Sequence, residues 1–229
     1  MPTADPFELI LWENVAYLAP LARRREAFEL LRRTVGTAPA AILAARQPAL
    51  EEVTARGILK GTFAAKLREC ARIALEHFRG DLEAVVREPP ERAARALRQF
   101  PGIGAPGAEK ILLFAGRQSL LAADSNALRV LARLGLIAED KSYARMYRAS
   151  RELAKKLVVE PRVMQEAHLL LEQHGKTLCK RAVPRCEACP LAARCAYAAN
   201  RGKSAKRARG AKPGLKTAAR RARAARTHR

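Results

Sequence analysis

The stretch CKRAVPRCEACPLAARC, from Cys179 to Cys195, decides the fold. Its four cysteines follow the spacing C-x6-C-x2-C-x5-C, and the fifth cysteine of the chain, Cys70, stands alone. Four thiols this close in sequence indicate one shared metal centre, in which Cys186 and Cys189 form a tight turn and the outer two close the site. Tetrahedral zinc and an iron–sulfur cluster both suit four thiolates. A zinc ribbon usually has two C-x2-C turns and this segment has one, so spacing alone leaves the two nearly balanced.

The charge of the chain points to a polyanionic partner. The 229 residues carry a formal net charge of +22. Residues 201–229 hold 12 Lys and Arg and no acid, so subtracting these 12 from +22 leaves +10 on residues 1–200. A body this basic favours nucleic acid as the partner. The composition of 201–229 predicts a disordered tail that attracts phosphate, or else a tail that only keeps the protein in solution.

Nothing in the sequence predicts a membrane protein. No apolar run approaches the roughly 20 residues that span a bilayer, and Met1–Phe7 has no basic region or signal-like apolar stretch. We therefore expect a cytoplasmic monomer that associates with the nucleoid through DNA.

The apolar pattern predicts helices throughout, because no stretch alternates with period two for long enough to form a strand. Asp5-Pro6 is typical of an N-cap and first helical residue, and the first helix is predicted to run to Leu18. The other predicted helices are 23–35, 40–45, 50–54, 64–78, 82–87, 91–99, 106–116, 125–134, 143–157 and 162–173.

A glycine hairpin separates two of these helices at Pro101-Gly102-Ile103-Gly104. Glycine tolerates the positive φ of a tight turn, and Ile103 is expected to plug the turn into the core. The hairpin amides and the free N–H groups of the next helix could then grip a phosphate. An interhelix turn without a ligand is the simpler alternative.

The cysteine spacing, with Pro190 after the third cysteine, resembles the cluster loop of the endonuclease III and adenine-mismatch-glycosylase family. The run from Pro101 to Ala108 resembles the helix-hairpin-helix element of the same superfamily. The resemblance implies an all-α fold of two helical domains: a six-helix domain with the hairpin in 1–118, and a helical domain in 119–200 whose four cysteines bind a [4Fe–4S] cluster. It also implies a DNA glycosylase of base-excision repair that binds double-stranded DNA with a damaged or mismatched base, flips that base out and hydrolyses its N-glycosidic bond.

Asp124 is the strongest catalytic candidate. It precedes a predicted helix, where the helix dipole keeps a carboxylate ionised, and there it could stabilise a sugar cation or align a water. A plain N-cap is the commonest role for such an aspartate. By resemblance Asp124 falls on the family's catalytic aspartate, and Asn126 matches the D-x-N form of the adenine-mismatch branch.

Glu13 is the second catalytic candidate. The helix around it is apolar on nearly every side, so a glutamate there is expected to keep a proton that it could donate to the leaving base. A buried hydrogen-bond network without catalysis is an equal alternative. The resemblance places Glu13 on the catalytic glutamate of the adenine-mismatch branch, but Tyr17 and Leu18 replace the glutamines that follow there.

The nucleophilic lysine of the bifunctional branch is missing. By resemblance its position holds Pro106, and Lys110 lies one helical turn further on, where a solvated lysine or a DNA phosphate contact is expected. We therefore expect a monofunctional glycosylase. The alternatives are an endonuclease III-like glycosylase/AP lyase that uses Lys110 or another amine, and a non-catalytic DNA-binding module.

Overall fold

The computed structural model describes residues 1–157 and 159–201, so the predicted tail lies outside the described residues except for Arg201. The described part is all-α and contains no strand, as predicted. Its helices are α1 (Pro6–Asn14), α2 (Leu21–Thr34), α3 (Pro39–Ala44), α4 (Gln47–Thr54), α5 (Lys60–Phe78), α6 (Leu82–Arg87), α7 (Pro90–Leu97), α8 (Ala105–Phe114), α9 (Ser125–Leu134), α10 (Tyr143–Lys155) and α11 (Pro161–Thr177), followed by the short 3-10 turns η1 (Cys186–Ala188) and η2 (Ala192–Arg194).

Every predicted helix is present, and α6 and α9 have the predicted bounds. Three helices differ by four residues or more from the predicted bounds: α5 begins at Lys60 instead of Ala64, α11 ends at Thr177 instead of Gln173, and α1 ends at Asn14 instead of Leu18. Leu18 adopts a left-handed backbone with φ of 55°, and Pro20 follows as the N-cap of α2, so the helix cannot continue through this turn.

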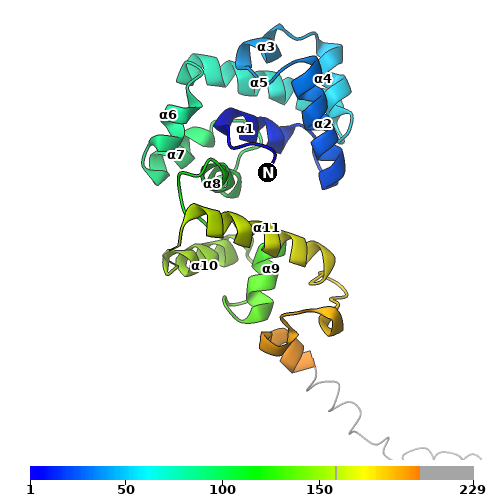
Figure 1. Cartoon of the computed structure of the whole chain (residues 1–229), viewed down its shortest axis with the longest axis vertical. Helices are drawn as coiled ribbons and strands as arrows, with labels where there is room; N and C mark the ends of the chain where they lie inside the picture. The colour runs from blue at the N-terminus through cyan, green and yellow to red at the C-terminus, as the bar shows by residue number, and fades with distance from the viewer. Residues whose placement is uncertain (158, 202–229) are drawn as a thin grey trace, which may run out of the picture.

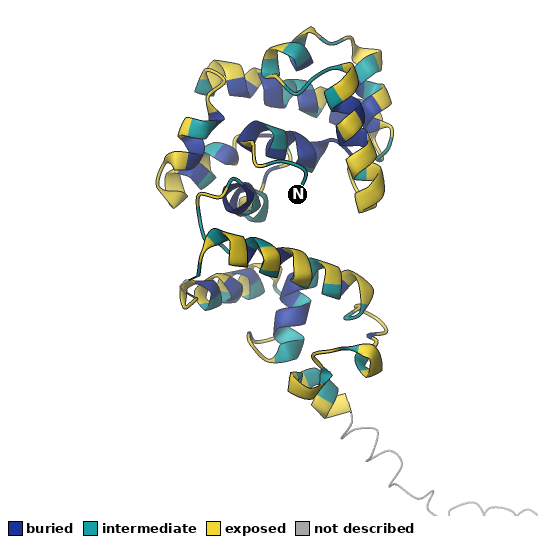
Figure 2. Ribbon diagram, in the orientation of Figure 1, coloured by how far each residue is buried: buried dark blue, intermediate teal, exposed yellow. Residues whose placement is uncertain are grey.

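The helices form two bodies (Figure 1). The first contains α1–α8, and the second contains α9–α11 followed by the cysteine segment. Helix α1 lies at the centre of the first body and is buried on nearly all sides (Figure 2), with Leu9, Ile10 and Leu11 at most 1% exposed. Helix α11 packs along α9 and also against α8, so it joins the two bodies. No helix of the described residues is long and apolar enough to cross a bilayer.

Candidate functional site

The glycine hairpin is built against the end of α1. Gly102 has φ of 77°, and a Cβ placed on it would lie 2.6 Å from Oδ1 of Asn14. The Asn14 side chain is completely buried, and its Nδ2 donates to the carbonyl of Pro101 at 3.0 Å and to that of Ile10 at 3.1 Å. Only glycine therefore fits at position 102, both in conformation and in space.

The hairpin leaves several backbone donors free. Ile103 is 5% exposed and plugs the turn into the core, as predicted. Among the described residues no hydrogen-bond acceptor meets the N–H groups of Gly102, Gly104, Ala105 or Gly107. These donors lie at the start of α8, where the helix dipole also favours an anion.

Asp124 caps α9 through both carboxylate oxygens. Oδ1 accepts from the Ala127 N–H at 2.8 Å, and Oδ2 accepts from Nδ2 of Asn126 at 2.9 Å. The capping role is therefore confirmed, but a cap uses only some of the lone pairs of a carboxylate. The side chain is half-buried, which leaves it accessible to a reactant.

A chain of hydrogen bonds runs from Asp124 to the cysteine segment. Arg129 Nη2 donates to Oδ1 of Asn126 at 2.9 Å and to the Gly175 carbonyl at 2.8 Å, and its Nε donates to the Cys179 carbonyl at 2.9 Å. A Cβ on Gly175 would lie 2.8 Å from the Asn126 Cβ, so α9 and α11 are in close contact here. The sequence did not single out Arg129, although its position on α9 connects the aspartate with the first cysteine.

Glu13 and Lys110 form an ion pair, which the sequence analysis did not predict. Lys110 Nζ lies 2.7 Å from Glu13 Oε2, and the side chains are 22% and 16% exposed. Glu13 Oε1 is buried without a hydrogen-bond partner in the described residues. The structure thus places Glu13, expected from the sequence to donate a proton to the leaving base, as the partner of Lys110.

His168, on α11, completes the group, and the sequence analysis missed it. The ring is 4% exposed and packs edge-on against Phe114 at 5.3 Å, and its Nδ1 is buried without a partner among the described residues. Burial lowers the pKa of His168, and the charge of Lys110 lowers it further, while Glu172 and Asp124 oppose the shift. The imidazole is thus neutral near pH 7 and lies within electrostatic reach of both Lys110 and Asp124.

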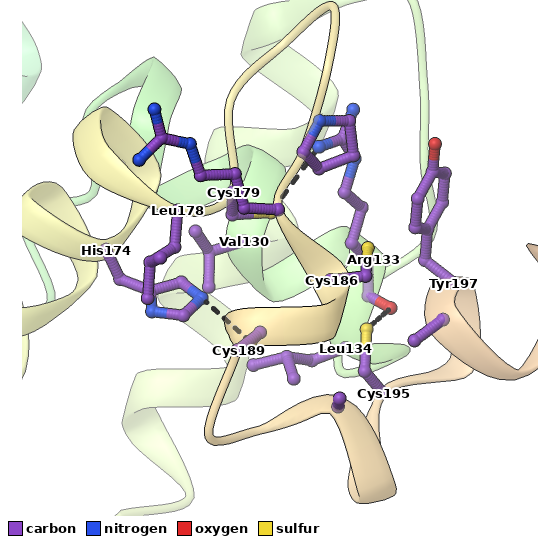
Figure 3. A pocket seen from close by; sticks show the side chains of 14 residues that line it. Val130, Arg133, Leu134, His174, Leu178, Cys179, Cys186, Cys189, Cys195 and Tyr197 are labelled. Atoms are coloured by element: carbon purple, nitrogen blue, oxygen red, sulfur yellow. Dashed lines mark hydrogen bonds between the residues drawn. The ribbon is translucent and has the colours of Figure 1, made fainter.

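The four cysteines enter one pocket, shown in Figure 3. Its wall is formed by α9, the end of α11 and the segment after it, and the pocket has about 370 Å³ of free space, including its open mouth. All four thiols are free and half-buried. Cys70 is far from this pocket in sequence and fully buried, and burial raises the pKa of its thiol to about 12.

Positively charged or polar donors face three of the sulfurs. Arg133 Nη1 lies 3.4 Å from the Cys179 sulfur and Arg201 Nη1 lies 3.7 Å from that of Cys186. His174 Nε2 lies 3.5 Å from the sulfur of Cys189. The fourth sulfur, that of Cys195, donates to the Arg133 carbonyl at 3.2 Å.

The donor set of this pocket is four thiols. Four thiolates suit tetrahedral zinc and an iron–sulfur cluster alike. Among the described residues no group of three or more His, Cys, Asp or Glu side chains is arranged to hold a metal ion.

Comparison with known proteins finds relatives in sequence and in structure. No family model matches it. It is 29% identical over 103 residues to endonuclease III of Rickettsia conorii, which covers 45% of this chain and 46% of that protein. It is 28% identical over 129 residues to DEMETER-like protein 3 of Arabidopsis thaliana, covering 51% of this chain and 12% of that protein. The match thus spans less than half of either relative.

A solved structure of a non-covalent endonuclease III–DNA complex superposes on 87% of this chain and 86% of that one with a TM-score of 0.69, at 20% identity. The chain has the endonuclease III fold. Its homologues and structural neighbours are members of the helix-hairpin-helix DNA glycosylase superfamily. The resemblance seen in the hairpin and the cysteine spacing is therefore confirmed at the level of fold and relatives.

Proposed function

We propose that this chain is a DNA glycosylase of base-excision repair that removes a damaged or mismatched base from double-stranded DNA. The observation that carries the proposal is the junction at the end of α1, where Asn14 holds the hairpin and its neighbour Glu13 holds Lys110. One helix end thus fixes both a set of free backbone donors for a DNA phosphate and a charged group for the base. Two relatives from Arabidopsis thaliana, DNA glycosylase/AP lyase ROS1 and adenine DNA glycosylase, are DNA glycosylases by name and support the same function.

In this proposal the hairpin Pro101–Gly104 binds the DNA backbone through its amides, without reading sequence. The bound nucleotide rotates out of the duplex so that its sugar faces Asp124. The Asp124 carboxylate stabilises the oxocarbenium character of the sugar and aligns a water for attack on C1′. Asn126 orients the carboxylate through its contact with Oδ2.

We further propose that the reaction is hydrolytic. Pro106 stands where the resembling lyases carry their amine. Lys110 lies one helical turn beyond that position, and Glu13 engages its Nζ at 2.7 Å. Lys110 would thus contact the base, and Glu13 would be a positioning residue that acts through it.

Cys179, Cys186, Cys189 and Cys195 are proposed to hold a [4Fe–4S] cluster, which when bound supplies a rigid charged centre to the segment around it. Arg129 and Arg133 fix that segment to α9 through backbone carbonyls, so an ordered segment also steadies Asp124 and Asn126.

We propose a boundary near residue 118 between a DNA-binding domain and this cluster domain, and a monomer as the active form.

The test is a screen of the full-length, cluster-containing protein against duplexes that each carry one damaged or mismatched base, with the free base detected by mass spectrometry. Release of a base from at least one duplex, and from no undamaged duplex, supports the proposal. Binding to an abasic-site analogue without any base release would favour a non-catalytic DNA-binding module.

A further inference from the structure

A pocket lies between the two bodies, where α1, α2 and α8 face α11. It has about 650 Å³ of free space, including its open mouth. Its wall includes the aromatic and basic side chains of Trp12, Arg24, Arg25, Lys110, His168 and Lys176. Arg24 stacks over the Trp12 ring at 5.7 Å from its centroid, so one wall combines an aromatic face with a cation.

The pocket is rich in cations and has no unpaired acid among the described residues that line it. Glu172 is the carboxylate of its wall, and it forms an ion pair with Lys176. Glu13 lies behind Lys110 and outside the pocket wall, and Lys110 occupies one of its oxygens. A base inside the pocket would therefore meet an ammonium where a proton-donating carboxylic acid was expected.

His168 adds a second hydrogen-bonding group to the same wall. Its ring is more than nine-tenths buried, and its Nδ1 has no partner among the described residues. An unpartnered buried nitrogen costs free energy unless a ligand pairs with it. A neutral imidazole nitrogen can accept from the N–H of a ligand while Lys110 donates to a neighbouring carbonyl oxygen.

This combination discriminates between two ways in which a base can leave. A purine such as adenine leaves readily only when a ring nitrogen is protonated, which requires an acid. A pyrimidine with the imide edge O=C–NH–C=O leaves as an anion whose charge spreads onto its carbonyl oxygens, and a nearby cation stabilises that charge.

We infer that the substrates of this pocket are imide-edged pyrimidine bases of the uracil and thymine type, with Lys110 stabilising the departing anion and His168 accepting from the ring N–H. The inference rests on the proposed glycosylase function and specifies its substrate class. The bond between N1 and C1′ breaks with its electron pair on N1. Water adds to C1′ and loses a proton to Asp124, and the base anion later takes a proton from solvent.

The experiment measures single-turnover base release by the full-length, cluster-containing protein. Each duplex carries one 5-fluorouracil, uracil, thymine, adenine or hypoxanthine, and 5-fluorouracil and thymine are placed opposite guanine. Without an acid to help, the rate should rise with the acidity of N1, in the order 5-fluorouracil, uracil, thymine. Both purines should react at least about 100-fold more slowly than uracil, the lower end of what one well-placed donor contributes.

Matched variants assign the effect to the cation. Lys110→Met should slow uracil release by about 100-fold or more while the affinity for an abasic-site duplex changes little, and Lys110→Arg should retain part of the rate because the cation remains. Lys155→Met makes the same change on exposed α10, away from the pocket, and should behave as the parent protein.

Faster release of adenine or hypoxanthine than of uracil, or a rate order that ignores N1 acidity, would overturn the inference and leave the glycosylase proposal standing. Release of no base from any duplex, combined with normal binding to abasic DNA, would overturn both.

Discussion

The hairpin and the cysteine segment are both held by side chains from a neighbouring helix, but in different ways. The hairpin is fixed by Asn14, a neutral and fully buried amide, and its apolar plug Ile103 is already in place. The cysteine segment is held by the half-buried cations Arg129 and Arg133, and the four thiols that line its inner side form no disulfide. An apolar plug and a buried amide thus fix the hairpin from inside, whereas the cysteine segment is held by cations at its edge.

Asp124 caps α9, the helix whose Arg129 and Arg133 hold the cysteine segment, and its loss should have the largest effect. We expect Asp124→Asn to slow base release by about 10²–10³-fold or more, because the charge it stabilises appears only in the transition state. Asparagine also caps helices, so the fold and duplex affinity should persist. Asp81→Asn makes the same change at the cap of α6 and should be silent. Full activity of a folded Asp124→Asn would reduce Asp124 to a plain cap.

Loss of the cluster should have the next largest effect, and it should affect the cysteine segment but not the hairpin. We expect Cys186→Ser to abolish the absorbance near roughly 400 nm that is typical of such clusters. Amide hydrogen exchange should then rise across residues 179–195 and stay unchanged in α1 and α8, because the hairpin does not depend on the cluster. Cys70→Ala is the matched control and should keep the colour. Stoichiometric zinc without iron in the parent protein would contradict the iron–sulfur assignment.

A double-mutant cycle measures how strongly Gly102 and Asn14 interact in the hairpin. Gly102→Ala should destabilise the fold by about 1–3 kcal/mol, because alanine resists the positive φ. Part of this cost comes from the approach of the new Cβ to Oδ1 of Asn14. We therefore expect the cost of Gly102→Ala to be smaller, by about 1 kcal/mol, in an Asn14→Ala background. Additive costs in urea unfolding would show that the two side chains do not meet.

The smallest effect should come from His168. Its folded-state pKa lies below the unfolded value near 6.5 because burial and Lys110 disfavour the charged ring. The unfolded state therefore binds more protons on acidification. The contribution of the neutral His168 ring to the free energy of unfolding is fully present above pH 6.5. It is lost as the pH falls from there through the folded-state pKa. His168→Gln should flatten the dependence of the urea midpoint on pH between 7.5 and 5.5, and an unchanged slope would mean that the pKa of the ring is the same in the folded and unfolded states.

Local pattern predicted much of the fold and part of the site. The helices, the plug Ile103 and the grouping of the four cysteines all follow from residues close in sequence, and the structure has each of them. The Glu13–Lys110 pair joins positions 97 apart, and it depends on how α1 packs on α8, which no local pattern encodes. His168 left a weaker trace, since it shares the buried face of α11 with Met164 one turn earlier and was the polar member of an apolar stripe.

The end of α1 shows the same limit. The apolar pattern continues to Leu18, but the backbone turns there into the left-handed region ahead of Pro20. The buried Asn14 side chain at the end of α1 then binds the hairpin carbonyl across 87 positions, a contact that no local pattern encodes.

The central claim is that this protein hydrolyses the glycosidic bond and leaves the strand uncut. The most direct measurement incubates the full-length protein with a duplex carrying one uracil opposite guanine and resolves the strand before and after alkali, with a parallel sample trapped by borohydride. We expect an intact abasic strand that alkali alone cuts, and little trapped adduct, because Pro106 stands where the resembling lyases carry their amine and Glu13 engages the nearby Lys110. A strand cut before alkali, with an adduct that disappears in Lys110→Ala, would contradict the account and make Lys110 the nucleophile.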